Sequence, residues 1–147
     1  KSLSLTESTF AKLSDWQILF DDFLQEKKSK PFKWGEWDCC KFSNALIKAM
    51  TGKDLIPKTL KWKDEESAIK AITSYGGDLE SSIEKVCNEK KVGEINKAFM
   101  TCGDLVVYSQ GESYLVGICD GFGILTPSDE GINVVQNDLA YRVWRFD

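Results

Sequence analysis

The spacing of the hydrophobic side chains changes near residue 101, and this change constrains the fold more than any other feature. Up to about residue 100 the apolar residues recur every three or four positions, which is typical of amphipathic helices. Beyond that point short apolar runs alternate with turn residues, which indicates antiparallel strands. The order predicts an α+β fold in which N-terminal helices pack on a C-terminal antiparallel sheet.

Capping residues and turns locate the expected elements. Ser14, Asp38, Asp64 and Asp78 each precede a helical stretch and are predicted N-caps. The first two helices are expected over residues 15–28 and 39–50, and the other two follow Asp64 and Asp78. The strands are expected over 104–109, 113–119, 124–126, 132–136 and 141–146.

The length of 147 residues and the lack of a Pro/Gly/Ser-rich linker predict one domain over residues 1–147. It is expected to be helical over 1–100 and a β-meander over 101–147. No apolar run approaches the ~18 residues that a membrane span needs. A formal net charge of −4 argues against nucleic-acid binding, which usually requires a basic surface.

The chain has no histidine, so it lacks the commonest general base and a common zinc ligand. Its five cysteines are odd in number and show no CxxC spacing, which favours free thiols in a reducing compartment. We expect no metal and no cofactor, because the cysteines are scattered. A four-thiolate metal site is the minor alternative.

Asp38-Cys39-Cys40 is the strongest candidate for a functional site. A thiol in the first turn of a helix faces unpaired amide groups and the positive end of the helix dipole, and both favour the nucleophilic thiolate. The alternative is that Cys39 is a small buried apolar residue and Asp38 only a cap. The residues expected to line a cleft beside Cys39 are Trp34, Gly35, Trp37, Asp38, Cys40, Asp104 and Asp120.

Three segments resemble papain-like peptidases of the NlpC type, which cleave peptidoglycan peptides. Residues 34–42 (WGEWDCCKF) resemble the segment in which the nucleophilic cysteine opens a helix. Residues 103–108 (GDLVVY) resemble a Gly-Asp-Leu-Val strand, and 115–118 (LVGI) resemble the His-Val-Gly-Ile strand that carries the base. The resemblance implies a papain-like, NlpC-like fold with Cys39 as the nucleophile position.

The likeness is closer to a small phage-encoded relative of this fold found among tail-tip genes. Its pattern is matched at residues 34–40, 51–54, 103–104, 117–121 and 140–145. This resemblance implies that the partners are phage tail hub and distal tail proteins, with contact to peptidoglycan. It also implies synthesis in the host bacterial cytoplasm and final residence in the tail tip of the virion.

The sequence departs from the peptidases where the base should be. Leu115 occupies the histidine position, and the third polar position falls near Thr126. Asp104 and Asp120 are the candidate replacements, but an unperturbed aspartate, with a pKa of ~3.9, is a weak base near neutral pH. Both aspartates also stand where turns or strand starts account for them.

The resemblance and the missing histidine predict a catalytically silenced peptidase scaffold that serves as a structural part of a phage tail tip or of its assembly. The alternative is a cysteine hydrolase, a peptidoglycan peptidase or amidase, that uses Cys39 with an unconventional base. A third interpretation is a domain that keeps the cleft to hold a peptide. Lys58, Lys61 and Lys63 alternate with Leu60 and Trp62, which indicates either a ligand surface or a solvated loop edge.

Overall fold

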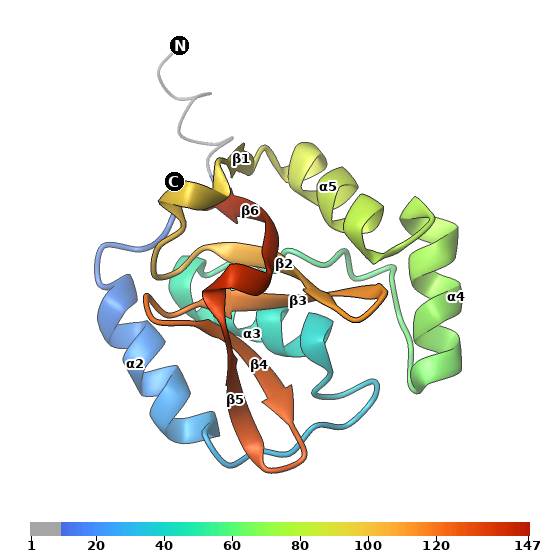
Figure 1. Cartoon of the computed structure of the whole chain (residues 1–147), viewed down its shortest axis with the longest axis horizontal. Coiled ribbons are helices and arrows are strands. Elements are labelled where there is room, and N and C mark those ends of the chain that lie inside the picture. Colours follow the sequence, from blue (N-terminus) through green and yellow to red (C-terminus); the bar gives the residue numbers. More distant parts are fainter. Residues whose placement is uncertain (1–9) are drawn as a thin grey trace.

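The computed structural model describes residues 10–147 and confirms the α+β fold, while residues 1–9 of the expected domain lie outside the described part. Figure 1 shows the strands in the middle of the molecule, with α2 on one side and α4 and α5 on the other. The helices are α2 (Trp16–Lys27), α3 (Cys39–Thr51), α4 (Glu65–Gly76) and α5 (Leu79–Lys90). The strands are β1 (Gly93–Ile95), β2 (Leu105–Gln110), β3 (Ser113–Cys119), β4 (Ile124–Ser128), β5 (Gly131–Val135) and β6 (Ala140–Arg145).

Three of the four expected helix caps are confirmed. The side chains of Asp38, Asp64 and Asp78 each accept the backbone N–H three residues further on, at 2.8–2.9 Å. The prediction for Ser14 is wrong, because Asp15 holds the N-cap position of α2 and its side chain makes no capping bond. The backbone turn before α2 already supplies an acceptor for its first amide.

The sheet has the order β1-β6-β2-β3-β4-β5, and all neighbouring strands are antiparallel. Strands β2 to β5 form the expected meander, but β6 leaves it and returns to the free edge of β2. The strands also begin before residue 101, since β1 pairs with β6. Three residues are too few for a periodicity to reveal β1, and the return of β6 is a long-range pairing.

Alternation along the strands gives the sheet two apolar faces. One face packs against the helices and includes Leu105, Val107, Val116, Ile118 and Leu125. The other face forms a second cluster with Val106, Tyr108, Cys119, Ile124 and Val143. Helix α3 lies on the first face against β3 and β4, so its first turn is held next to the middle of the sheet.

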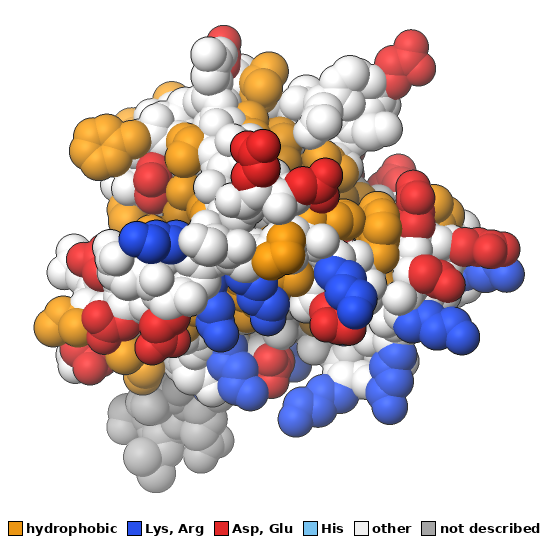
Figure 2. Space-filling view, turned by 90° about the horizontal axis from the view of Figure 1, so that it is seen from below, with side chains coloured by type: hydrophobic (Ala, Val, Ile, Leu, Met, Phe, Trp, Pro, Cys, Tyr) orange, Lys and Arg blue, Asp and Glu red, His pale blue; other side chains and the backbone are white. Residues whose placement is uncertain are grey.

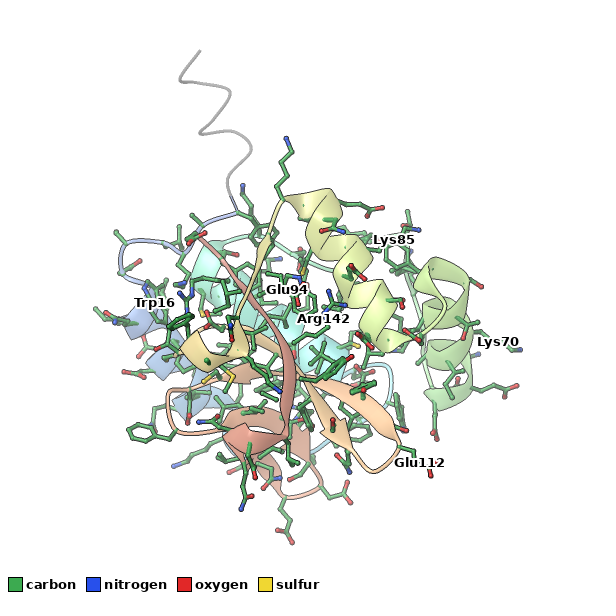
Figure 3. All side chains as sticks on the ribbon, turned by 45° about the horizontal axis from the view of Figure 1, so that its top comes forward. Trp16, Lys70, Lys85, Glu94, Glu112 and Arg142 are labelled. Carbon is green, nitrogen blue, oxygen red and sulfur yellow. The ribbon has the colours of Figure 1, made fainter. Side chains whose placement is uncertain are left out.

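Arg142 on β6 ties the far edge of the sheet to α5. Its guanidinium nitrogens lie 2.7 Å from Glu94 of β1, 3.2 Å from Glu80 and 3.4 Å from Glu84 of α5. Figure 3 shows the Arg142 and Glu94 side chains next to each other below α5. This network fixes β1 and α5 relative to the sheet and is a structural feature of the fold.

Candidate functional site

The Asp38 carboxylate organises the start of α3. Its Oδ1 accepts the N–H of Lys41 at 2.9 Å, and its Oδ2 accepts the N–H of Gly35 at 3.0 Å and the indole Nε1–H of Trp62 at 2.8 Å. The residue is 1% exposed. Both carboxylate oxygens therefore hold neighbouring segments in place and are engaged as acceptors.

The turn before α3 requires glycine at position 35. The φ of Gly35 is +85°, and a Cβ there would lie 2.6 Å from the carbonyl carbon of Lys63. That distance is shorter than van der Waals contact allows, so a larger residue would push the two segments apart. The close approach brings the loop after α3 next to the start of the helix.

Cys39 is the first residue of α3 and is half-buried, whereas Cys40 is buried. The hydrogen bond from the Cys40 thiol lowers the pKa of Cys39, burial opposes this shift, and the backbone N–H of Val116 supports it. The pKa of Cys40 is raised well above its usual value by the same hydrogen bond and by burial. Cys39 is therefore the thiol of this pair that ionises first.

Leu115, at the expected base position, lies on β3, and Thr126, at the expected third polar position, lies on β4. Leu115 pairs with Tyr108 across the β2–β3 ladder, and the Tyr108 hydroxyl donates to Thr126 Oγ1 at 3.2 Å. Burial raises the pKa of Tyr108, the bond to Thr126 opposes the shift, and the charge of Cys39 adds to it. Tyr108 and Leu115 lie on the face of the sheet opposite α3, and of the three residues Tyr108 is the one whose pKa responds to Cys39.

Tyr108 is the residue that the sequence analysis did not select. The expected turn at residues 110–112 would place position 108 opposite position 114, whereas the loop consists of Gly111 and Glu112 alone, so that Tyr108 pairs with Leu115. A tyrosine with a raised pKa stays protonated at neutral pH and donates hydrogen bonds rather than accepting a proton. Tyr108 therefore does not supply a proton acceptor for Cys39.

The two tryptophans expected to line the cleft differ in burial. Trp37 is 4% exposed and packs between Phe23, at a ring distance of 6.0 Å, and Phe42, at 5.5 Å. It belongs to the core between α2 and α3 because its indole points away from the surface. Trp34 is 37% exposed and contacts Phe32 edge-on.

Asp104 and Asp120, both expected to line the cleft beside Cys39, are each engaged in hydrogen bonds of their own. Asp104 is fully buried and accepts two hydrogen bonds from Arg145, at 2.9 and 2.8 Å. Asp120 Oδ1 accepts the N–H groups of Phe122 and Gly123 and closes an exposed turn. Since Asp120 follows Val116 by four residues, the extended strand alone separates them by about 13 Å.

Two general properties concern the part of the chain that the structure describes. Within residues 10–147 no helix has the length and apolar character needed to cross a membrane. Over the same range no three cysteine, aspartate or glutamate side chains gather closely enough to hold a metal ion.

These features define an α+β domain in which a cysteine opens a central helix against an antiparallel sheet. The chain belongs to the family described as "Domain of unknown function (DUF6950)", whose model matches residues 11–146. No curated protein matches the chain. The family match spans all the described helices and strands and assigns no activity to them.

Proposed function

We propose that this chain is a structural component of a phage tail tip, built on an NlpC-type, papain-like peptidase scaffold whose catalytic site is silent. One observation carries the proposal. Cys39 opens α3 next to the backbone of Val116, and the adjacent Leu115 stands where the resembling peptidases carry their histidine.

Proton transfer is the step that this arrangement does not support. A cysteine peptidase needs a base within hydrogen-bond reach of the thiol, and loss of that base costs several orders of magnitude in rate. Leu115 has no titratable group, and Asp38 has both oxygens engaged by three donors. Burial raises the pKa of Tyr108, so it remains protonated.

The proposed partners are tail hub and distal tail proteins, and the proposed location is the tail tip of the virion after synthesis in the bacterial cytoplasm. The support is the order of the five segments matched between residues 34 and 145. The DUF6950 match over residues 11–146 is compatible with this proposal and does not itself name a partner.

A cysteine hydrolase acting on peptidoglycan amide bonds is the second candidate, and the lowered pKa of Cys39 favours it. A thiol with a lowered pKa forms the thiolate more readily and needs less help from a base to attack a carbonyl carbon. In that case an unconventional proton donor would have to protonate the leaving amine.

A release assay on purified peptidoglycan and stem peptides separates the two candidates. We expect the wild-type chain and Cys39→Ser to give the same background, because neither can complete the proton transfers. Turnover by the wild type that disappears in Cys39→Ser would establish the hydrolase instead. Leu115→His tests the scaffold further, since an imidazole at the position where the resembling peptidases carry histidine should accelerate the alkylation of Cys39 at pH 7.

The structural role has its own test in virions of a phage that encodes this chain. Mass spectrometry and antibody labelling of purified particles should place the protein at the tail tip, and deletion of its gene should leave tails incomplete. Complete, infectious particles without the protein would refute the structural role.

A further inference from the structure

An apolar cavity of about 50 Å³ lies between α3, the loop after it and the α4–α5 pair. Its walls include Ile47, Leu55, Ile72 and Val86, together with the buried Cys40. The volume is several times what one water molecule needs, yet an apolar lining offers water few partners. The cavity is therefore suited to an aliphatic group.

A larger hollow of about 400 Å³ adjoins this cavity, because the two share Asn44, Ile56, Pro57 and Leu60 as lining residues. The charged side chains that line the hollow are Lys41, Lys58, Lys61 and Asp54. The Asp54 carboxylate already accepts a hydrogen bond from Asn44 and pairs with Lys48 at 3.4 Å. The hollow thus carries an excess of positive charge.

The basic character of this region contrasts with the net charge of −4 of the whole chain. Figure 2 shows a face on which Lys and Arg side chains gather in the lower half, with hydrophobic and some acidic side chains among them. Apolar surface beside lysine side chains complements a ligand that has an aliphatic part and a negative group.

Ser43 supplies an independent indication of a ligand. It lines the cavity, it is 3% exposed, and its Oγ has no hydrogen-bond partner among the described residues. A buried hydroxyl without a partner destabilises a fold, so native structures seldom keep one without a reason. Ser43 lines the inner cavity next to Asn44, and Asn44 lines both spaces.

We propose that these adjoining spaces bind a small aliphatic anion. Its apolar chain occupies the inner cavity, its negative head group accepts a hydrogen bond from Ser43, and Lys41, Lys58 and Lys61 surround the head. The site is distinct from Cys39, which lines neither space. The proposal does not rest on the tail-tip function, and the two are tested by independent experiments.

Titration of the full chain with straight-chain carboxylates from butanoate to dodecanoate tests the proposal by calorimetry. We expect saturable binding whose affinity rises about fourfold for each added CH₂ until the inner cavity is full and then levels off. Octylammonium and octanol should bind at least tenfold more weakly than octanoate. Equal binding of octylammonium, a rise that continues to dodecanoate, or no saturable binding would overturn the proposal.

Ser43→Ala distinguishes a ligand-binding hydroxyl from a structural one. We expect the octanoate affinity to fall about tenfold, since a hydrogen bond to a charged group is lost. The urea midpoint of the unliganded protein should stay the same or rise, because the unpartnered hydroxyl is removed. A lower midpoint with unchanged affinity would mean that Ser43 is structural and would overturn the proposal.

The double variant Lys58→Ala with Lys61→Ala should lower the octanoate affinity about tenfold and leave the weak binding of octanol unchanged. Lys70→Ala is the matched control, since Lys70 is an exposed lysine of α4 (Figure 3) that pairs with Glu66 and lines neither space. Equal loss in the control would show that only net charge matters and would overturn the assignment to this site.

Discussion

The two ends of the β2–β3 pair carry different parts of what a catalytic site needs. One end, the half nearer the hairpin, carries Tyr108 and Leu115, and Val116 next to them contacts Cys39 at the start of α3. The other end holds the carboxylates of Asp104 and Asp120. A nucleophile and potential bases are both present in the chain, but the length of the strands keeps them apart.

The cysteines at the two ends differ in the direction of their pKa shifts. Cys39 and Cys102 are both half-buried. A hydrogen bond from Cys40 lowers the pKa of Cys39, whereas burial and the nearby charges of Cys119 and Asp120 raise the pKa of Cys102 to about 11. Exposure alone therefore does not decide which thiol ionises, because the donors and charges around each sulfur act in opposite directions.

Replacement of Asp104 tests the carboxylate end and should have the largest effect. Asp104→Ala should lower the free energy of unfolding by about 4 kcal/mol, since it leaves Arg145 without its buried partner. Urea denaturation measures this loss, and the exposed Asp129→Ala should change the value by less than about 0.5 kcal/mol. A loss below about 1 kcal/mol would contradict the buried ion pair.

Replacement of Asp38 tests the thiol end. Asp38→Ala should lower the free energy of unfolding by about 3 kcal/mol, because the helix loses its cap and the buried Trp62 indole loses its acceptor. Asp78→Ala is the matched control, since it removes a cap that has no second role, and should cost about 1 kcal/mol. Equal losses in both variants would mean that the Trp62 contact contributes nothing.

Alkylation rates compare the thiols of the two ends directly. At pH 8 a lowered pKa leaves more thiolate on Cys39, and a raised pKa leaves less on Cys102. Allowing for the lower nucleophilicity of a more acidic thiol, we expect iodoacetamide to modify Cys39 about tenfold faster. Peptide mapping by mass spectrometry gives both rates in one sample. Equal rates would contradict the pKa difference between Cys39 and Cys102.

Tyr108→Phe should have the smallest effect. It removes one hydrogen bond, to Thr126, and should lower the free energy of unfolding by less than about 1 kcal/mol. The pH dependence of Cys39 alkylation should remain unchanged, because the donors that favour its thiolate are Cys40 and Val116. A shifted profile would show that the tyrosine hydroxyl acts on the thiol.

Local features were predictable from the sequence. Asp38 was identified as the cap of α3, and the hairpin between β2 and β3 was located to within one residue at each strand end. Both depend on hydrogen bonds that close within a few residues. The burial of Trp37 was not predictable, because it depends on contacts with Phe23 of another helix.

The sequence by itself determined that a thiol opens a helix and that no histidine is present to serve it. Only the tertiary structure decided what surrounds that thiol, which carboxylates are engaged and where the unpartnered Ser43 lies. The reason is the range of the interactions. A cap acts over three residues, whereas the Arg145 that engages Asp104 comes from a strand 41 residues away.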